Sequence, residues 1–531
     1  MLASTRIRAG RLTVSRLIRT WHSADRDEEV SDDRAGHGQT MRTESAGSGR
    51  HGQGIESGSA GAEQTLVVLG AGGDLTARLL LPGLGGLLAR SPDQGLFLLG
   101  SGMDDWDDER WRRRVSDSFS SASATGAQVT ATIQSTRYLQ ADVTRPEDLR
   151  RLLAAGRGRL VIFFALPPAV TVKACGALAE IGLPEGTRLV LEKPFGTSTA
   201  GAEQLNELLA TLVPEDQIHR VDHFLGKSTV LNILGLRFAN RLFEPTLNAE
   251  HVAGVDIVFD ESLALEGRAG YYDSAGALID MVQSHLLQVL ALLAMDAPPT
   301  LEAREVRDRK AQVLRATRLW SDDVRACTRR ARYTAGEIDG RRLPAYADEA
   351  GVDESRGTET LAEVVLAVDT WRWAGVPFRL RSGKAMSATR KEAVITFKQP
   401  ARVPDGLTGY ERPDRLRISF GPDRLAIDMN INGPGDPFAI DPVTLEADFG
   451  PGELPPYGEV LRGVLDDDPT LSVRGDTAEQ CWRIVEPVLT AWRNDAVPLL
   501  EYPAGGSGPD DSLLSAALPF PAPDTGRRAG A

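Results

Sequence analysis

The strongest constraint on the fold is a glycine-rich turn between a short apolar segment and a helical segment. Residues 65–69 read TLVVL, a run typical of a buried strand, and residues 70–75 read GAGGDL. The apolar spacing of residues 76–88 predicts a helix directly after the turn. Glycines at such a junction let the backbone approach a pyrophosphate, and the helix N-terminus offers free amides. A tight turn without a ligand is the alternative, but this position at the first strand–helix junction favours dinucleotide binding.

The segments that follow continue this alternation. Apolar runs predict further strands, and amphipathic spacing predicts further helices, so that strands at 96–99, 160–165 and 188–191 alternate with helices at 106–119 and 169–181. Strands that alternate with helices favour a parallel sheet with right-handed crossovers. The sequence therefore predicts an α/β, Rossmann-like dinucleotide-binding domain over residues 64–222.

After about residue 225 the pattern changes to strands without intervening helices. Alternating segments occur at 251–259, 361–371, 376–381, 392–398, 415–420, 424–431 and 443–449. Helices are predicted near 275–295, 455–465 and 476–494. This pattern predicts a C-terminal α+β domain, over residues 223–510, with a large and mostly antiparallel sheet. Residues 1–63 are expected to be a disordered extension, because they lack sustained apolar periodicity, and residues 511–531 a flexible tail, because the chain from residue 505 onward is rich in Gly, Pro and Ser.

The charge and composition of the chain disfavour several classes of partner and location. The chain of 531 residues carries a net charge of −14, so nucleic acid and anionic membrane surfaces are disfavoured partners. No uninterrupted apolar run reaches the ~18 residues of a membrane-spanning helix. The three cysteines are scattered and form no CxxC motif, which favours a reducing, cytoplasmic location and argues against a structural metal site.

Lysine is rare in this chain, and its positions are therefore informative. Lys and Arg total 60, but only seven are lysines, at positions 173, 193, 227, 310, 384, 391 and 398. A retained lysine can mark a site that needs a compact ammonium group, although chance is an equally good explanation for any single one. Histidine is also sparse, and only four lie outside the N-terminal extension.

Several of these ionisable residues fall in clusters. Lys193 follows the strand at 188–191, where ligands of parallel sheets bind, although a surface turn is the alternative. Residues 220–227 read RVDHFLGK, which suits an anion and a proton relay or simply a solvated loop. His285 lies in a very apolar segment, where a hydrogen-bonded core histidine is the alternative. Lys384 ends the segment RSGK, which could be an ordinary hairpin end.

Taken together, these motifs resemble the glucose-6-phosphate dehydrogenase family. The matching stretches are GAGGDL (70–75), FALPP (164–168), LEKPFG (191–196), DHFLGK (222–227), LRFANRLFEP (236–245), EGRAGYYDSAGALIDMVQSHLLQ (266–288), WRWAGVPFRLRSGK (371–384) and YPAGGSGP (502–509). They occur in the family's order and cover most of residues 64–510.

The resemblance implies an activity and a set of site residues. The activity is oxidation of D-glucose 6-phosphate at C1 to 6-phospho-glucono-1,5-lactone, with hydride transfer to NADP or NAD, as the first step of the oxidative pentose phosphate pathway. The implied general base is His285, with Asp222 as its carboxylate partner. The implied substrate ligands are Lys193, His223, Lys227, Glu261, Asp280 and Lys384. The implied cofactor ligands are Gly70, Gly72, Gly73, Asp74, Leu75, Met103, Asp104 and Lys193. A homodimer or homotetramer is expected, and no metal.

Departures from the family pattern keep two alternatives open. Phe224 stands where the family usually has Tyr, and Gly421 stands where members often place Gln. A related sugar-phosphate dehydrogenase with another substrate, or a catalytically silent binding paralogue, therefore remains an alternative.

The cofactor also stays open between NAD and NADP. Gly72 offers no hydroxyl to a 2′-phosphate, and Met103 is followed by two aspartates. An acid at this strand end suits a ribose 2′-hydroxyl and repels a 2′-phosphate.

Overall fold

The computed structural model describes residues 63–91, 95–267, 269–409, 412–433, 435–448, 450 and 452–509. The predictions of a disordered extension at 1–63 and of a flexible tail at 511–531 therefore fall outside the described residues, apart from Glu63. The proposed boundary between residues 222 and 223 also stays a prediction.

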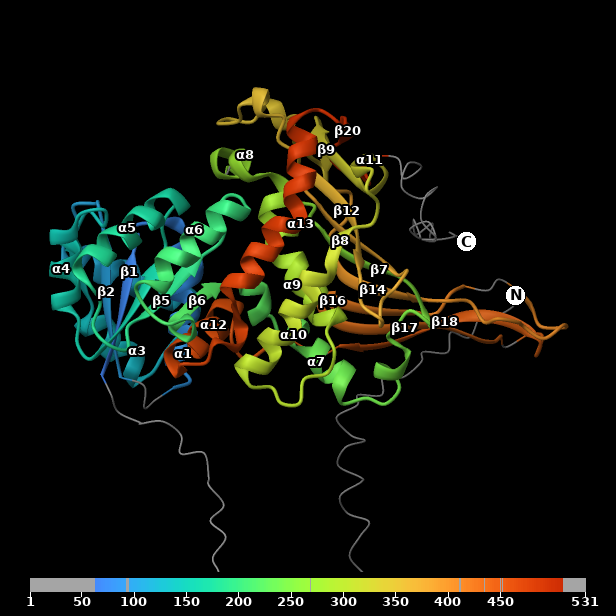
Figure 1. The fold of residues 1–531 in the computed structure, drawn as a ribbon, viewed down its shortest axis with the longest axis horizontal. Coiled ribbons are helices and arrows are strands. Elements are labelled where there is room, and N and C mark those ends of the chain that lie inside the picture. Colours follow the sequence, from blue (N-terminus) through green and yellow to red (C-terminus); the bar gives the residue numbers. More distant parts are fainter. Residues whose placement is uncertain are drawn as a thin grey trace, which may run out of the picture. The chain divides into compact units, whose positions relative to one another are not determined.

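The N-terminal part contributes six strands to a seven-stranded sheet, and β1 and β2 of this sheet are drawn in blue in Figure 1. Its strands, in spatial order, are β19 (Ser472–Val473), β6 (Ile218–Val221), β5 (Arg188–Glu192), β4 (Arg159–Phe164), β1 (Gln64–Leu69), β2 (Leu96–Gly102) and β3 (Arg137–Gln140). All neighbouring pairs are parallel except β19 with β6. Strands 3-2-1-4-5-6 form the Rossmann order, and the order reverses between β1 and β4.

Helices connect these strands, as Figure 1 shows for α4, α5 and α6. They are η2 (Thr76–Leu80), α1 (Leu81–Leu88), α2 (Asp108–Ser121), α3 (Ala127–Ser135), α4 (Pro146–Ala155), α5 (Pro168–Ile181), α6 (Thr199–Ala210) and the short η3 (Glu215–Gln217). The predicted helix at 76–88 exists, but its first turn is a π-helix, in which the Leu81 amide donates to the Thr76 carbonyl. Alternate residues of β1 face opposite sides, with Val68 in one hydrophobic cluster and Val67 in the other.

The second sheet has eleven strands. In order along it lie β15 (Thr408–Gly409), β18 (Ala439–Asp448), β17 (Asp423–Asn432), β16 (Arg415–Phe420), β14 (Arg390–Phe397), β7 (Val252–Asp260), β13 (Pro377–Gly383), β12 (Leu361–Val368), β9 (Thr328–Thr334) and β20 (Leu499–Pro503), with β8 (Thr317–Leu319) beside β12. Three pairings are parallel, namely β7 with β13, β9 with β20, and β15 with β18. The others are antiparallel.

Helices cover this sheet, and Figure 1 shows α9, α10 and α13 beside its strands. They are α7 (Ser228–Phe238), α8 (Ala269–Ala277), η6 (Leu278–Leu286), α9 (Leu287–Ala294), α10 (Ala303–Ala316), α11 (Val324–Cys327) and α13 (Gly475–Arg493), whereas α12 (Pro456–Asp466) packs against α1. Shorter elements are η4 (His223–Gly226), η5 (Glu244–Thr246), η7 (Tyr346–Asp348), η8 (Glu354–Arg356), η9 (Pro469–Leu471) and the hairpin of β10 (Gly336–Ile338) with β11 (Arg341–Leu343). The predicted fold class, a Rossmann-like α/β domain plus an α+β domain with a large, mostly antiparallel sheet, is confirmed.

One helical stretch is more apolar than the sequence analysis recognised. Residues Tyr272–Ala294 span 23 residues and are, by length and composition, apolar enough to cross a membrane. The apolar window of this stretch is 89% buried inside the protein, as expected for a core helix. His285 lies within it, so the predicted base is placed in the hydrophobic core.

The C-terminal chain returns to the first sheet. Strand β19 adds an antiparallel edge to β6, and α12 packs against α1. Arg188 of β5 is 1% exposed, and its guanidinium donates to the carbonyls of Val464 and Leu465 and pairs with Asp467 at 2.8 Å. This return was not predicted from the sequence, because β19 is only two residues long.

Candidate active site

A carboxylate and an imidazole from different elements meet in the core. Asp222 follows the last residue of β6, so it lies at the carboxyl end of the parallel sheet, while His285 projects from η6. His285 Nδ1 and Asp222 Oδ1 are 2.5 Å apart, and each side chain is 1% exposed. The structure thus brings together the two residues that the sequence analysis paired.

The electrostatics of the pair favour a neutral imidazole beside an ionised carboxylate. Burial lowers the pKa of His285, although Asp222 partly opposes this effect. Burial would raise the pKa of Asp222, but the adjacent His285 and the Phe224 amide that bonds to Oδ1 leave it below its usual range. The free Nε2 of such an imidazole is suited to accept a proton.

The helix that carries His285 has π winding, which determines what lies beside the base. At its end the Leu287 amide donates to the carbonyl five residues earlier, at Val282. Residues five apart in an α-helix are separated by about 140° around the axis. The wider π winding brings residue i+5 much closer to the face of residue i. Asp280 and His285 are five residues apart and therefore serve the same site.

A glycine and a buried glutamate fix the start of this helix. Gly276 has a φ of +68°, and a Cβ there would lie 2.4 Å from Glu359 Oε1. The Leu278 amide donates to that oxygen at 2.9 Å, so Glu359 satisfies an otherwise unpaired N–H of the first turn. Burial raises the pKa of Glu359 to about 7. Glu359 was not predicted from the sequence, because its role depends on a contact 81 residues away in the chain.

Lys193 links β5 to the same helix. Its ammonium group donates to the carboxylate and to the backbone carbonyl of Asp280, both at 2.7 Å. Burial opposes ionisation of Asp280, yet Lys193 lowers its pKa to about 2. The ion pair therefore places a fixed positive charge and a fixed carboxylate next to the dyad.

Aromatic rings surround the base on its other sides. The Phe224 ring stacks on His285 with centroids 4.1 Å apart and planes within 9°. The His223 ring meets His285 edge-on at 4.6 Å, and burial lowers the pKa of His223 to about 3. Lys227 Nζ lies 4.3 Å from the Phe224 ring centroid. His223 and Lys227 thus lie close to the dyad, as predicted.

Glu261, just after β7, forms ion pairs with two lysines. Lys384 Nζ bonds to Oε2 and Lys391 Nζ to Oε1, each at 3.0 Å. Burial opposes ionisation of Glu261, but these two ammonium groups lower its pKa. Lys384 and Glu261 were predicted site residues, whereas Lys391 was missed. The rarity of lysine was the signal that could have identified it.

The glycine loop forms the second part of the site, at the point where strand order reverses. Gly70 has a φ of +91°, and a Cβ there would lie 2.1 Å from the Ala165 carbonyl oxygen at the end of β4. The Thr76 hydroxyl donates to the Gly70 carbonyl and fixes the turn against the helix. Residues 70–75 thus combine a closely packed backbone with the start of a helix, at Gly73, Asp74 and Leu75. Both features suit the binding of a nucleotide pyrophosphate.

The predicted ribose-binding residues lie beside this loop. A Cβ at Gly72 would lie 2.2 Å from Asp104 Oδ2, so the Asp104 carboxylate occupies the space next to the loop. Met103 is 69% exposed. Of the nearby cations, Arg78 forms a surface ion pair with Asp74 at 3.2 Å, and Arg110 lies over Trp106 at 4.8 Å.

The dyad residues also satisfy the geometry of a metal cluster. Donor atoms of Asp222, His223 and His285 lie within 4.8 Å of one another. A metal there would compete with the proton that the base must accept, and the expectation that the protein uses no metal stays a prediction.

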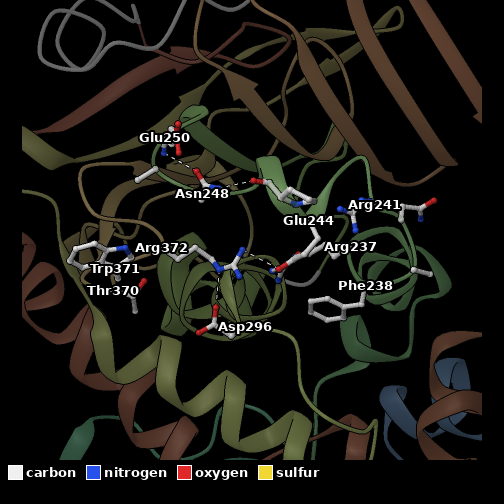
Figure 2. Close-up of a pocket in the computed structure, with 14 residues that line it drawn as sticks. Arg237, Phe238, Arg241, Glu244, Asn248, Glu250, Asp296, Thr370, Trp371 and Arg372 are labelled. Atoms are coloured by element: carbon white, nitrogen blue, oxygen red, sulfur yellow. Dashed lines mark hydrogen bonds and ion pairs between the residues drawn. The ribbon is translucent and has the colours of Figure 1, made fainter.

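A cleft of about 1080 Å³ lies elsewhere and shares no lining residue with the dyad (Figure 2). Figure 2 shows Arg372 reaching between Glu244 and Asp296, with which it pairs at 3.0 and 2.8 Å. Arg237 likewise pairs with Glu244. Because these guanidinium groups are neutralised within the protein, the size of the cleft alone does not make it a ligand site.

A Rossmann sheet that presents a glycine loop and a buried carboxylate–imidazole pair at its carboxyl end defines a nucleotide-dependent dehydrogenase. Sequence comparison then specifies the family. Residues 67–232 match the NAD binding domain of glucose-6-phosphate dehydrogenase, and residues 234–517 match its C-terminal domain. The chain belongs to the glucose-6-phosphate dehydrogenase family.

Individual relatives agree with this assignment. Glucose-6-phosphate 1-dehydrogenase of Treponema pallidum is 35% identical over 86% of this chain and 95% of its own length. The enzyme of Gluconobacter oxydans is 38% identical over 84% and 94%. A solved glucose-6-phosphate dehydrogenase in complex with glucose-6-phosphate is 28% identical with a TM-score of 0.77, covering 86% of this chain and 98% of that one.

Proposed function

We propose that this protein oxidises D-glucose 6-phosphate at C1 to the 1,5-lactone, with NAD or NADP as the hydride acceptor. The observation that carries the proposal is the buried pair of His285 and Asp222 at the carboxyl end of a dinucleotide-binding sheet. Family membership, and the glucose-6-phosphate bound to a relative of the same fold, support this substrate.

The proposed chemistry assigns the proton to His285. Oxidation of a hemiacetal carbon removes a hydride from C1 and a proton from its hydroxyl, and when bound the nicotinamide accepts the hydride. His285 Nε2 accepts the proton, because Nδ1 is held by Asp222 and burial keeps the imidazole neutral beforehand. Asp222 then stabilises the imidazolium.

The sugar is proposed to bind between the charged pairs around the base. Lys193 and Asp280 from one side, and Glu261 with Lys384 from the other, offer donors and acceptors for hydroxyl groups. His223 and Lys227 are proposed to bind the phosphate. The glycine loop with Gly70, Gly72 and Asp104 is proposed to hold the adenosine half of the cofactor.

The test of the base assignment is His285→Asn, which retains a hydrogen-bonding side chain but cannot accept the proton. We expect kcat with glucose 6-phosphate to fall by roughly 10²–10⁴, while fluorescence titration shows little change in cofactor Kd. His251→Asn is the matched control, because His251 is exposed and lies outside the site. Near-normal turnover of the His285 variant would overturn the assignment.

A homodimer or homotetramer is also proposed. Strands β17 and β18 expose the large apolar side chains of Met429, Ile431 and Leu445, each between 37% and 55% accessible. Exposed apolar residues clustered on one sheet edge are typical of protein–protein contacts. Sedimentation of the full chain measures the oligomeric state, and a monomer at micromolar concentration would contradict the proposal.

A cytoplasmic location is proposed on the state of the cysteines. All three are buried and unpaired, at positions 175, 327 and 481. Free thiols without disulfide partners favour a reducing compartment.

A further inference from the structure

The stretch YPAGGSGP, at residues 502–509, has no role in the site described above, yet it contacts the turn between β13 and β14, residues 384–389. Its first residue, Tyr502, lies in β20, which pairs with β9, and Figure 1 shows these two strands side by side. The Tyr502 side chain is 1% exposed, and its hydroxyl donates to the Lys384 carbonyl at 2.7 Å. The stretch therefore contacts the backbone of a proposed sugar ligand.

The single proton of the Tyr502 hydroxyl is used for this contact. Thr360 Oγ1 lies 2.8 Å from the same hydroxyl and donates to its oxygen, because the tyrosine proton is already bonded to Lys384. Burial raises the pKa of Tyr502, so the hydroxyl keeps its proton at neutral pH. The Lys384 amide in turn donates to the Thr360 carbonyl at 3.0 Å. Both backbone polar groups of Lys384 are thus bonded to Tyr502 and Thr360.

The residue after Lys384 has an unfavourable backbone conformation. Ala385 is fully buried and has a φ of +51°, in the left-handed region that residues with a Cβ rarely adopt. Such a conformation persists only where the surroundings determine it. The Ala385 carbonyl accepts from the Gly505 amide at 2.8 Å, and Tyr502 bonds to the carbonyl on the other side of Ala385. The C-terminal segment therefore fixes this strained turn at two successive peptides.

The same turn carries one half of the proposed sugar site. Lys384 Nζ donates to Glu261 Oε2 at 3.0 Å, and the Met386 amide donates to the Glu261 carbonyl at 2.9 Å. A rotation of the peptide between Lys384 and Ala385 toward a negative φ would relieve the strain but break the Tyr502 hydrogen bond. It would also displace the turn relative to Glu261.

We propose that Tyr502 is a positioning residue for the sugar, because its hydroxyl fixes the turn at Lys384 and Ala385 and so keeps the Lys384 ammonium group on Glu261, where both meet the sugar hydroxyls. This inference rests on the proposed function. Tyr502 acts on the substrate through Lys384, since its hydroxyl bonds to the Lys384 backbone and to Thr360.

The competing explanation is that Tyr502 only anchors β20 in the core. Tyr333 provides the matched control, because it stands opposite Tyr502 in the register of β9 and β20 and is also 1% exposed. Its hydroxyl donates to Glu349 at 2.7 Å instead of to the turn. Tyr333→Phe therefore removes a comparable hydrogen bond from the same part of the core without releasing Lys384.

The experiment measures steady-state kinetics and thermal unfolding of both variants. We expect Tyr502→Phe to raise KM for glucose 6-phosphate by roughly three- to tenfold, with kcat and the KM for the cofactor within about twofold of the wild type. Tyr333→Phe should lower the midpoint of thermal unfolding to a similar extent but leave all three kinetic constants unchanged. An unchanged KM in Tyr502→Phe, or an equal rise in Tyr333→Phe, would overturn the inference.

Two double variants test whether Tyr502 acts through the turn. In a Lys384→Met background, Tyr502→Phe should raise KM no further, because the side chain that it positions is gone. Ala385→Gly combined with Tyr502→Phe should recover part of the lost affinity, because glycine adopts a positive φ without strain. An effect of Tyr502→Phe that is equally large with and without Lys384, or no recovery by glycine, would contradict the proposed route.

The outcomes also separate this inference from the proposed function. A wild type that does not oxidise glucose 6-phosphate would refute the proposed substrate itself. A wild type that does oxidise it, with Tyr502→Phe kinetically indistinguishable from Tyr333→Phe, would refute only the role of Tyr502.

Discussion

At the residue scale, the site depends on a few side chains whose charge states are set by burial. His285 and Asp222 are both fully enclosed, and their 2.5 Å separation makes each the main partner of the other. His219 is fully buried and His223 is half-buried, and burial lowers their pKa values to about 4 and about 3. Both histidines are therefore neutral in the pH range in which the base is expected to act.

The first consequence is an acid limb in the pH profile. The base must be neutral, and burial lowers the pKa of His285 below the ordinary value of about 6.5. We therefore expect kcat/KM to be constant at neutral pH and to fall only below about pH 6.5 as the imidazole becomes protonated. A midpoint above pH 7 would contradict this prediction.

Asp222→Asn tests the origin of that limb. Asp222 favours the imidazolium and so raises the pKa of His285 against the effect of burial. Removing its charge should move the limb to lower pH while also reducing kcat. A shift to higher pH would show that Asp222 is not the partner of the base.

At the element scale, the glycine loop and the end of β2 act as one unit. The Asp104 carboxylate, at the end of an exposed side chain, lies beside Gly72, so a larger residue at 72 would require this side chain to move. An aspartate here accepts hydrogen bonds from a ribose, whereas a 2′-phosphate brings close to two negative charges against it.

We therefore expect the wild type to use NAD in preference to NADP. We expect the Kd for NADP to exceed that for NAD by roughly ten- to a hundredfold, which corresponds to the free energy of one lost charge-assisted hydrogen bond. Asp104→Ser with Met103→Arg should shift kcat/KM toward NADP, whereas Asp105→Ser, which changes the neighbouring acid, should shift it less. A wild-type preference for NADP of tenfold or more would mean that a cation such as Arg110 or Arg114 reaches the phosphate.

At the scale of the whole molecule, the C-terminal chain closes over the nucleotide sheet. The Arg188 guanidinium satisfies the last carbonyls of α12 and pairs with Asp467, and His219 of β6 contacts the Ser472 hydroxyl at 3.1 Å. These contacts join segments that are nearly 280 residues apart in the sequence. The stability of the first sheet therefore depends on residues of the C-terminal chain.

Arg188→Ala should therefore destabilise both parts together. The variant leaves two buried carbonyls unpaired, which costs about 2–4 kcal/mol. Arg159→Ala is the control, because Arg159 is partly exposed and meets Asp467 only at 3.6 Å. The measurement is the midpoint of unfolding in guanidinium chloride. Equal midpoints for the two variants would show that the packing of α12 against the first sheet does not depend on Arg188.

Sequence reasoning succeeded where apolar spacing alone determines structure. Strands β1, β4 and β5 are continuous apolar runs, and their predicted bounds were nearly correct. Strand β6 was missed because it reads IHRV, whose buried His219 and Arg220 need partners from other segments. Helix α10 was missed because charged residues interrupt its apolar stripe.

The same reasoning located the site residues but not the geometry that unites them. The motifs and the family resemblance indicated His285 and Asp222. No local pattern, however, indicates that these two residues, 63 apart in the chain, come within 2.5 Å of each other. Lys391 and Glu359 carry no motif, and their places depend on pairing between strands and on a helix cap.

The π winding of η6 has a consequence for how such a site can be gained or lost. Its buried residues include Leu278, Met281, Val282 and Leu286, so apolar side chains point in most directions around its axis. If the winding became α-helical while every residue stayed, Asp280 and His285 would lie about 140° apart around the axis and could no longer serve one site. If one codon between them were deleted at the same time, the two residues would stand four apart, about 40° around the axis, and would still share a face. A one-codon insertion or deletion in this segment is thus compatible with the same pair of side chains, provided that the winding changes with it.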